Sequence, residues 1–419
     1  MAEAPYDVLV VGAGLAGLVA GLAAARRGAR TLVLAQGFGT IPFRSGTVDV
    51  LGYLDGAPVE SPAADVAALS KAHPGHPYGV CGEGLEPALD LVLEAAMALG
   101  LGLEGSLREN RLVATAAGTL RPSCLVPGTM ARRWPGARVL AVGFDFLRDF
   151  HPDLFAAVLP AAAAARGAAA SVRVARVAVP GFPRHLDGLA LARRFEDAAL
   201  RRDVVRALKP DLEGMDVVAF PAVLGLDGHA EVVRELSSAL GAAVAELPTL
   251  PPSVPGLRLQ RALQGALERA GGRLQVGARA RLVTKGEEVL WLEVESAARP
   301  LRLPVTRLVL ATGGLVSGGL RLKSSGEVVE EVAGLPVEVP AGPSESWFER
   351  GFLDREGQAA ARMGLRVDRA LHPLEGGRPA LQGVFAAGGL LAGADRAAEK
   401  SADGIACASG YLAGVGAAA

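Results

Sequence analysis

Cysteine is scarce in this sequence of 419 residues: only Cys81, Cys124 and Cys407 occur, far apart along the chain. They form no C-x-x-C pair, no ligand run for an iron–sulfur cluster and no disulfide framework. Three scattered thiols fit a reducing compartment, so we predict a cytoplasmic protein. His73 and His76 stand among prolines, without a nearby acidic or cysteine partner, and we therefore predict no metal site.

An excess of one charge sign is also absent. The chain has 43 basic and 44 acidic residues and a formal net charge of −1. A balanced chain has no overall positive field for nucleic acid or for an anionic membrane, so neither is expected as a direct partner. One apolar run, residues 8–25, has about the length of a membrane span. Its leader carries acids and no base, so we expect neither a signal peptide nor a transmembrane helix.

Aromatic residues make up only 5% of the chain, whereas glycine occurs 54 times. Half of the residues are apolar and 21% are charged, which indicates a globular rather than a disordered protein. The length predicts two or three domains, at roughly 150 residues per domain. Abundant glycine indicates tight turns and places where the backbone approaches another group closely.

The first motif combines a strand, a glycine-rich turn and a helix. Residues 6–11 are rich in β-branched residues and predict a buried parallel strand. The turn has the pattern G-x-G-x-x-G, and a helix over 18–27 and a second strand over 31–34 follow it. This is the context that a dinucleotide-binding turn requires. We predict that the turn binds a cofactor phosphate through Gly12, Ala13, Gly14, Leu15, Ala16 and Gly17.

Each glycine of this turn has its own expected role. Gly12 permits the tight turn, Gly14 lets the backbone approach the phosphate, and Gly17 lets the helix pack close to the strand. The acidic residue that normally binds an adenosine ribose is missing, since Ala35 and Gln36 stand at its position. Either other groups hold the adenosine half, or the ligand is FMN, which has none. We predict FMN, with FAD as the alternative, and we disfavour an NAD-dependent enzyme.

Further glycine-rich loops suggest more of the cofactor site. The loop after the second strand contains an Arg-Ser-Gly run. We expect this run either to lie over the cofactor or to form a polar turn. Two later strands, which end near residues 311 and 387, run into pairs of small residues. There the backbone must pass close to a ligand or to another loop. The predicted cofactor contacts in these loops are Ser45, Gly46, Thr312, Gly313, Gly388 and Gly389.

The middle of the chain predicts a mixed α/β insertion. A helix over 85–99 precedes a strand over 139–143, a helix over 155–166 and strands over 172–179 and 217–221. Residues 191–209 predict one amphipathic helix with six basic and three acidic residues, which is a docking face or, as we favour, a solvated surface. Residues 247–256 are too proline-rich for a helix and predict an extended loop before a helix over 257–270.

This order of motifs is the layout of large flavoprotein oxidoreductases. We predict an α/β fold: a Rossmann-like, two-part flavin-binding domain of the FAD/NAD(P)-binding type, with a large inserted α+β cap domain. The flavin-binding domain is expected to combine residues 1–50, 251–325 and 370–419. Residues 51–250 form the inserted cap or substrate domain, and residues 326–369 form a smaller cap or a connecting segment.

The chain resembles the B subunits of anaerobic glycerol-3-phosphate dehydrogenases, from about residue 6 to residue 416. The glycine turn is shared by very many flavoproteins and discriminates little. The resemblance depends on five more specific segments: Phe43-x-Ser45-Gly46-x-x-Asp49-x-Leu51, His76-Pro77-Tyr78, Gly118-Thr119-Leu120-Arg121, the proline-rich run from Leu247 to Leu259, and Ser317-Gly318-Gly319-Leu320. The family's final loop, roughly G-C-G-G-G, is replaced here by residues 400–404, Lys-Ser-Ala-Asp-Gly.

The resemblance implies a flavin-dependent subunit of a quinone-linked enzyme that oxidises sn-glycerol 3-phosphate to dihydroxyacetone phosphate in anaerobic respiration. It implies a catalytic, FAD-containing A subunit and an iron–sulfur C subunit that passes electrons to membrane quinone. It also implies FMN in the B subunits and peripheral membrane association through the partners. By the same layout, the helix that follows Gly404 directs its N-terminus to the flavin. Two alternatives stay open: a non-catalytic assembly subunit, or an FAD-dependent oxidoreductase of another substrate.

A substrate with a phosphate dianion calls for arginine or lysine. Arg44 and Arg258 are the predicted substrate contacts, and a loop-bracing or surface role is the alternative for each. No general base can be chosen from the sequence. His76 is a weak candidate, because a loop-packing role between Gly75 and Pro77 suits it better.

Overall fold

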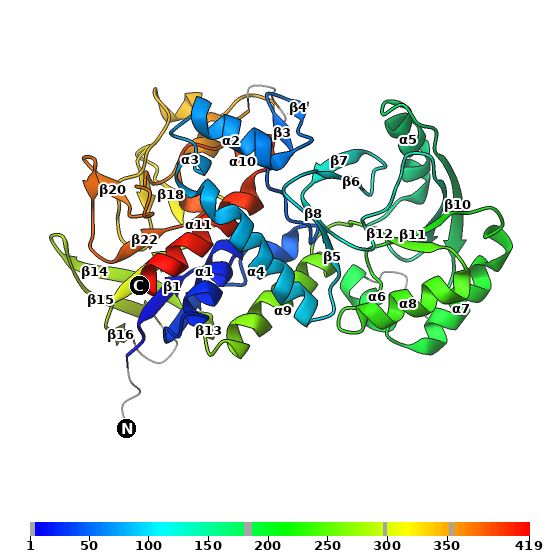
Figure 1. Ribbon diagram of the computed structural model, residues 1–419, viewed down its shortest axis with the longest axis horizontal. Helices are drawn as coiled ribbons and strands as arrows, with labels where there is room; N and C mark the ends of the chain where they lie inside the picture. Colours follow the sequence, from blue (N-terminus) through cyan, green and yellow to red (C-terminus); the bar gives the residue numbers. More distant parts are fainter. Residues whose placement is uncertain (1–4, 180–186, 296–299, 352–353, 355–356) are drawn as a thin grey trace. The chain divides into compact units, whose positions relative to one another are not determined.

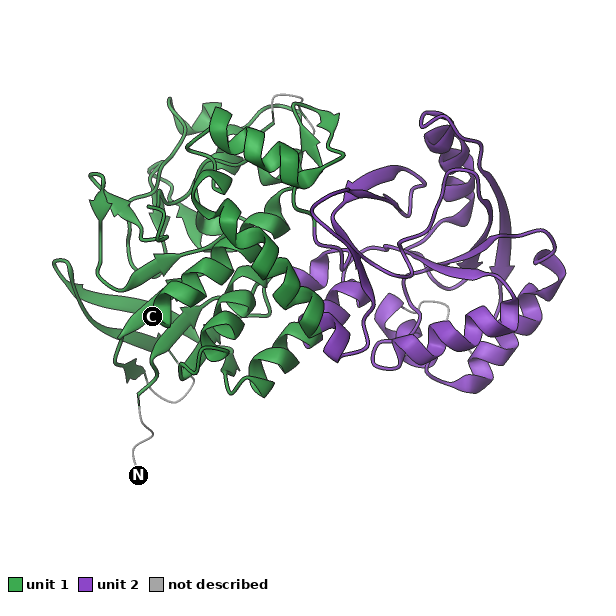
Figure 2. Cartoon of the chain, viewed as in Figure 1, with its two compact units in different colours: residues 1–40, 49–95, 262–419 green, residues 41–48, 96–261 purple. Residues whose placement is uncertain are grey.

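The computed structural model describes residues 5–179, 187–295, 300–351, 354 and 357–419. By their contacts they divide into two compact units (Figures 1 and 2). Unit 1 comprises residues 1–40, 49–95 and 262–419, and unit 2 comprises residues 41–48 and 96–261. This division differs from the predicted domains, because residues 51–95 belong to unit 1 and residues 41–48 and 251–261 to unit 2. The structure does not test the predicted roles of these parts. The flavin-binding domain, the cap domain and the smaller cap or connecting segment 326–369 therefore stay a prediction.

Unit 1 is built on a five-stranded parallel sheet in the order β13-β2-β1-β17-β22. Buried aliphatic side chains fill β1 and β2, as expected for strands covered on both faces. Strands from the two ends of the chain lie side by side, since β1 pairs with both β2 and β17. The strands are β1 (Val8–Val11), β2 (Thr31–Ala35), β13 (Arg273–Val276), β17 (Arg307–Leu310) and β22 (Val384–Ala386).

Two helices of unit 1 pack closely: α1 (Leu15–Ala25) and α11 (Ala402–Ala417) (Figure 1). The helix predicted over 18–27 begins three residues earlier, and the last helix, expected after Gly404, already begins at Ala402. The remaining elements of unit 1 are β3 (Tyr53–Leu54), β4 (Ala57–Pro58), α2 (Pro62–Ala72), α3 (Tyr78–Cys81), α4 (Leu85–Ala98, which extends into unit 2), β14 (Arg279–Lys285), β15 (Glu288–Glu295), β16 (Leu301–Leu303), β18 (Leu320–Leu322), β19 (Val328–Glu330), β20 (Leu374–Glu375), β21 (Arg378–Pro379) and α10 (Arg396–Glu399).

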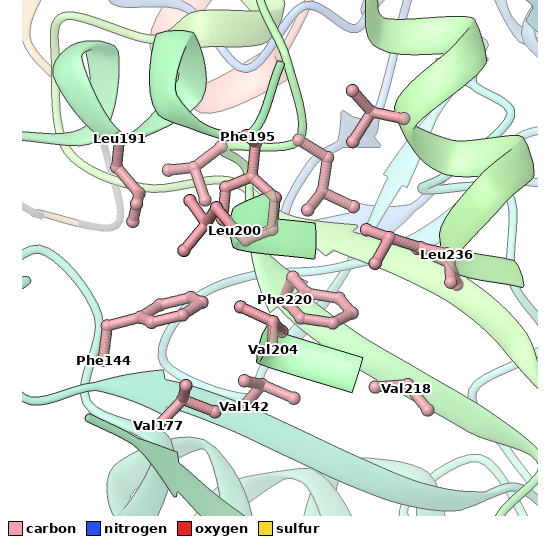
Figure 3. Close-up of a cluster of buried hydrophobic side chains, with 14 of the residues drawn as sticks. Val142, Phe144, Val177, Leu191, Phe195, Leu200, Val204, Val218, Phe220 and Leu236 are labelled. Carbon is pink, nitrogen blue, oxygen red and sulfur yellow. The ribbon is translucent and has the colours of Figure 1, made fainter. Parts of the chain in front are cut away.

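Unit 2 contains a four-stranded parallel sheet in the order β10-β9-β11-β12 and two short antiparallel pairs, β5–β8 and β6–β7. Its aromatic and aliphatic core includes Phe144, Phe195 and Phe220 (Figure 3). Its elements are β5 (Leu103–Gly105), β6 (Arg111–Ala114), β7 (Leu120–Ser123), β8 (Leu125–Pro127), β9 (Arg138–Phe144), α5 (Pro152–Ala164), β10 (Ser171–Val177), α6 (Gly188–Arg194), α7 (Ala198–Leu208), β11 (Val217–Pro221), α8 (His229–Leu240), β12 (Ala243–Leu247) and α9 (Val254–Arg269, which continues into unit 1).

Two predicted elements of the insertion differ from the structure. The single helix expected over 191–209 is wrong, because α6 ends at Arg194 and α7 begins at Ala198. The side chain of Asp197 accepts a hydrogen bond from the Ala199 N–H and so starts a new helix. The loop expected over 247–256 is three residues too long, since α9 already begins at Val254. A proline in the first turn, here Pro255, costs no intrahelical hydrogen bond.

Candidate cofactor site

The turn between β1 and α1 has the geometry that its glycines predict. Gly12 has a φ of +117°, and a Cβ built there would lie 2.2 Å from the carbonyl oxygen of Ala311. A Cβ built on Gly17 would lie 1.8 Å from the carbonyl oxygen of Gly12. Both positions therefore exclude a side chain because the protein's own backbone occupies the space.

Gly14 differs from its two neighbours in the motif. Its φ of −73° and ψ of −176° suit any residue, and no described heavy atom lies within 4 Å of a Cβ built on it. Neither conformation nor packing explains the missing side chain. The open space in front of the backbone is therefore suited to a ligand.

The start of α1 also offers hydrogen-bond donors. Within the described part of the chain, no side chain caps this helix, and no backbone carbonyl accepts the N–H groups of Leu15 and Ala16. A helix N-terminus carries a partial positive charge, and its first N–H groups point outward. Together with the open space at Gly14, this arrangement fits the phosphate of a dinucleotide or flavin cofactor.

Two glycine-rich loops pack beside the turn. A Cβ on Gly388 would lie 2.6 Å from the Cβ of Ala16, and a Cβ on Gly389 would lie 3.3 Å from the Cα of Gly313. The N–H of Gly388 donates to the hydroxyl of Ser409 in α11 at 2.8 Å. The structure thus brings the predicted residues of 12–17, 312–313 and 388–389 together in unit 1. The sequence predicted that small residues occur here because the backbone passes close to a ligand or to another loop. The structure shows the second of these, since the loops pack on one another.

Thr312 supplies a second sign of a ligand. Its hydroxyl oxygen is buried and has no hydrogen-bond partner among the described residues. Its backbone nitrogen lies 3.1 Å from the position of a Cβ on Gly12, so the residue adjoins the phosphate turn. An unpaired buried hydroxyl costs roughly 1–3 kcal/mol, and native proteins rarely leave one without a partner. A bound cofactor that accepts or donates a hydrogen bond there would remove this cost.

Gly404, in the first turn of α11, is enclosed by protein. A Cβ on Gly404 would lie 2.2 Å from the hydroxyl of Tyr78 and 2.8 Å from the Cα of Val50. Its N–H donates to the carbonyl oxygen of Asp49 at 3.0 Å. The buried carboxylate of Asp403 accepts a hydrogen bond from the Asp49 N–H at 3.2 Å. These contacts attach the start of α11 to residues 49–50, and a role of Gly404 toward a cofactor stays a prediction.

His76 lies in a buried hydrogen-bond network of unit 1. The backbone N–H of Tyr78 donates to Nδ1 of His76 at 3.1 Å, so the ring proton belongs on Nε2 and is donated to Glu399, also at 3.1 Å. Ser401 Oγ donates to the same carboxylate at 2.6 Å. Burial raises the pKa of Glu399, but the hydrogen bonds from His76 and Ser401 outweigh it, and the pKa lies below its ordinary value. The network favours the loop-packing role of His76.

Ser45 and Gly46 lie in unit 2, where they contact the segments named in the resemblance. The guanidinium of Arg121 donates through Nη2 to Ser45 Oγ at 2.8 Å and to Thr47 Oγ1 at 3.0 Å. A Cβ on Gly46, which has a φ of +76°, would lie 2.6 Å from the Cβ of Pro255. Arg121 is a residue of this loop cluster that residue-by-residue reasoning missed, since only the fold brings it to the Ser45 loop.

Arg44 and Arg258 also lie in unit 2, on segments that pack against each other. The carbonyl oxygen of Arg44 would be 2.7 Å from a Cβ on Gly256, two residues before Arg258. Arg44 itself is half-buried, whereas Arg258 is buried. The cation of Arg258 donates through Nη1 and Nη2 to Glu246 at 2.8 and 3.0 Å, and through Nε to the Gly225 carbonyl oxygen at 2.9 Å. These bonds favour the loop-bracing alternative for Arg258.

Glu246 is the partner that sequence reasoning missed. Its fully buried carboxylate also accepts hydrogen bonds from Thr129 Oγ1 at 2.9 Å and from the Leu224 N–H at 3.0 Å. Burial raises the pKa of Glu246, but the charges of Arg258 and the nearby His229 and the hydrogen bonds from Arg258 and the Leu224 N–H outweigh it and hold the pKa at about 2. An acid twelve positions before an arginine is no local signal, so only the fold shows the pair.

Known proteins match this chain along nearly its whole length. A family described as an FAD binding domain matches residues 7–405. A protein of Halobacterium salinarum, named as the probable B subunit of an anaerobic glycerol-3-phosphate dehydrogenase, is 36% identical, covering 98% of this chain and 97% of that protein. The anaerobic glycerol-3-phosphate dehydrogenase B subunit of Pectobacterium carotovorum is 33% identical, covering 96% of this chain and 95% of that protein.

A solved structure is also similar: the 3-ketosteroid-delta4-(5alpha)-dehydrogenase from Rhodococcus jostii RHA1 in complex with 4-androstene-3,17-dione. Its TM-score is 0.45 at 14% sequence identity, and the match covers 100% of this chain and 97% of that one. The description of the matched family names FAD, so our prediction of FMN as the main cofactor is not supported. The missing acid at Ala35 removes one possible ribose contact, which does not by itself decide the cofactor.

Proposed function

The chain belongs to the FAD-binding domain family and to the B subunits of anaerobic glycerol-3-phosphate dehydrogenases, and from this we propose that it is a flavin-dependent redox subunit of such an enzyme. The complex would oxidise sn-glycerol 3-phosphate to dihydroxyacetone phosphate and deliver the electrons to membrane quinone. Its partners would be a catalytic, FAD-containing A subunit and an iron–sulfur C subunit.

The observation that carries this proposal is the pairing of open space at Gly14 with the unpaired hydroxyl of Thr312. The proposed cofactor is FAD. Leu15 and Ala16 would donate their N–H groups to its phosphate, and Thr312 would hydrogen-bond another of its polar atoms. Gly313, Gly388 and Gly389 would keep the neighbouring backbone close enough to exclude water. The bound flavin would supply the redox chemistry, which the side chains of the chain lack.

Oxidation of a secondary alcohol to a ketone releases two electrons and two protons. The three cysteines of the chain are scattered and buried, so no cluster of their thiolates is available to carry the electrons onward. An iron–sulfur partner would therefore take the electrons from this subunit. The part of the chain that the structure describes has no helix that is both long and apolar enough to cross a membrane. Contact with the membrane would then be peripheral and made through the partners.

Arg44 is proposed as a contact of the substrate phosphate, because a guanidinium pairs with two phosphate oxygens at once. Arg258 would hold the loop that carries Arg44, through Glu246 and the packing of Gly256 against residue 44. The two arginines would thus act at different distances from the substrate. Substitution of Arg44 by glutamine is expected to raise KM for glycerol 3-phosphate more than it lowers kcat.

The test is the cofactor itself. The purified chain is expected to be yellow, to release FAD on acid precipitation as judged by mass spectrometry, and to lose its visible absorbance when glycerol 3-phosphate is added without oxygen. FMN in stoichiometric amount would reject FAD. A yellow protein that glycerol 3-phosphate fails to reduce, alone or with its A subunit, would point to another substrate.

A non-catalytic assembly role is the second candidate function. The observation that favours it is the start of α11, where Asp403 is buried and the N–H of Gly404 is already bonded to Asp49. A carboxylate at a helix N-terminus opposes a bound anion. A colourless chain that still co-purifies with the A subunit would support this candidate, and stoichiometric flavin in the isolated chain would exclude it.

A further inference from the structure

A cavity lies entirely within unit 2, between α7 and α8. Its volume is about 270 Å³, and its walls come from both helices. Three exposed cations line it, together with the buried Arg201 and small apolar residues such as Ala198 and Ala239. The exposed cations are Arg202, Arg206 and Lys209. None of these residues belongs to the proposed flavin site.

More cationic side chains line this cavity than form ion pairs within the fold. Arg201 pairs with Glu235 at 2.7 Å and donates to the Phe195 carbonyl oxygen at 2.8 Å, so it is a structural cation. Arg206 pairs with Asp203 at 3.0 Å. The side chains of Arg202 and Lys209 form no ion pair or hydrogen bond with the described residues.

Like charges at these spacings cost stability. Arg202 and Arg206 are four residues apart and Lys209 follows three residues later, so the cations lie on one side of the helix. Such pairs destabilise a helix when nothing compensates them. One acid, Glu235, lines the cavity, and Arg201 already neutralises it. An anion bound in the cavity would compensate the remaining charge.

The core fixes the direction in which α7 presents these cations. Leu200, Val204 and Leu208 on its other side are buried in the core of unit 2, to which side chains of β9, β10 and β11 also belong. Figure 3 shows Leu200 and Val204 in this core. The helix also begins at a defined point, because Asp197 caps it. Arg202 and Arg206 therefore project from a helix whose backbone is fixed, and Lys209 follows directly after its last residue. A fixed backbone reduces the entropic cost of binding.

We propose that the cavity between α7 and α8 binds the phosphate group of an anionic ligand. Arginine offers a planar fork of N–H donors that matches two phosphate oxygens, and lysine adds a compact charge. With a volume of about 270 Å³, the cavity has room for a phosphate with a short organic group. The same chemistry is offered by a free phosphate monoester and by the phosphomonoester headgroup of a lipid. The proposal does not depend on the function of the flavin site.

The test compares two double variants of the full chain. R202Q/K209Q removes the two unpaired cations of the cavity, and R193Q/R234Q removes two exposed cations from α6 and α8 outside it, with the same change in net charge. Circular dichroism and thermal unfolding midpoints establish that both variants are folded. Binding of inorganic phosphate is measured by calorimetry. Sedimentation with phosphatidylcholine vesicles, with and without phosphatidic acid, measures binding to the lipid headgroup.

The expected result is saturable binding that R202Q/K209Q weakens by about tenfold or more, and that R193Q/R234Q leaves within about twofold. Added salt should weaken the binding of the native chain, because exposed charges are screened. Phosphate binding without vesicle binding assigns the site to a free ester, and binding to the acidic vesicles assigns it to a lipid. Equal losses in both variants, or no saturable binding to either probe, would overturn the proposal. If R202Q/K209Q lost only its association with the partner proteins, the proposal would also fall, in favour of a protein contact.

Discussion

The three glycines of the opening turn lack a side chain for different reasons. Positions 12 and 17 must be glycine because backbone carbonyl oxygens of the protein would lie 2.2 and 1.8 Å from a Cβ built on Gly12 and Gly17, respectively. Gly14 is required by neither conformation nor neighbours. A residue whose surroundings do not explain it indicates a group outside the chain, and here the helix N-terminus beside it indicates an anion.

Substitution of Gly14 by valine is therefore expected to remove the flavin and spare the fold. Valine readily adopts the extended conformation of this position, so stability should change by less than about 1 kcal/mol. Its branched side chain would fill the space in front of the N–H donors. The measurements are flavin absorbance per chain and the thermal midpoint. Gly75→Val is the control, since no described heavy atom lies within 4 Å of a Cβ there either. Normal flavin content in soluble Gly14→Val protein would contradict the prediction.

The Glu246–Arg258 pair predicts a pH dependence of stability. The pKa of Glu246 lies at about 2 in the folded chain and near the ordinary 4.5 in the unfolded one. Between these values the unfolded carboxyl binds a proton that the folded one does not, so stability is lost as the pH falls from 4.5 towards 2. The total loss is about 3 kcal/mol.

Chemical denaturation across this pH range measures the effect. Other carboxyl groups titrate in the same range, so the native chain is compared with the double variant E246Q/R258M. Replacing both partners avoids an unpaired buried charge, which would cost several kcal/mol in a single variant. The double variant should show a shallower fall in stability. Parallel curves for the two proteins would show that Glu246 is not the responsible group.

Helices α1 and α11 are joined by a seam of small residues. A Cβ on Gly410 would lie 2.4 Å from the carbonyl oxygen of Ala16, and one on Gly414 would lie 2.2 Å from that of Ala20. The backbones therefore touch, which holds the first turn of α1 against the C-terminal helix. The phosphate turn depends on this element contact for its position.

Gly410→Ala is expected to destabilise the chain by roughly 1–3 kcal/mol, because the added methyl group meets backbone that cannot move aside. The matched control is Gly416→Ala in the same helix. A Cβ there meets the ring edge of Phe385 at 3.1 Å, which can yield by rotation, and alanine favours a helix by roughly 0.5–1 kcal/mol over glycine. Denaturant midpoints of the two variants check the difference. Equal midpoints would mean that the seam tolerates a wider separation.

Some elements can be predicted from the sequence because their signals are local. The strand, turn and helix of residues 8–25 follow from β-branched residues and three spaced glycines. The division of residues 188–208 into two helices escapes prediction, although Asp197 is a cap residue, because the amphipathic pattern continues across the break. The early start of α9 escapes it because a proline in a first turn has the same sequence signal as a helix breaker. The pairs Arg121–Ser45 and Arg258–Glu246 depend on tertiary structure, which no local pattern encodes.

At the scale of the whole molecule, the proposed phosphate contacts of the cofactor lie in unit 1. The phosphate turn and the loops at Thr312 and Gly388 all belong to unit 1. A ligand that binds only the folded state stabilises it by about 2.7 kcal/mol at a hundred times its Kd. For a unit of this size, that raises the unfolding midpoint by roughly 5–10 °C.

Added FAD should therefore raise the midpoint temperature at which unit 1 unfolds and leave that of unit 2 unchanged. Calorimetric scans with and without FAD measure both midpoints. Gly14→Val is the control, because its scans with and without FAD should coincide. Equal movement of every transition would show that both units contribute to binding or that they unfold together.

The strand order of unit 1 has a consequence for the order of events during synthesis. Once residue 261 has been made, all of unit 2 exists, but only β1 and β2 of the five parallel strands do. The partners of β1 and β2, namely β17 and β13, come later in the chain. At about 5–20 residues per second, the ribosome needs roughly 2–10 seconds to supply them. During that time the outer edges of β1 and β2 have no partner strand, whereas all residues of unit 2 are already present. The nascent chain is thus most exposed to aggregation at these two strands, and cofactor capture must wait for the strands and loops that follow residue 261.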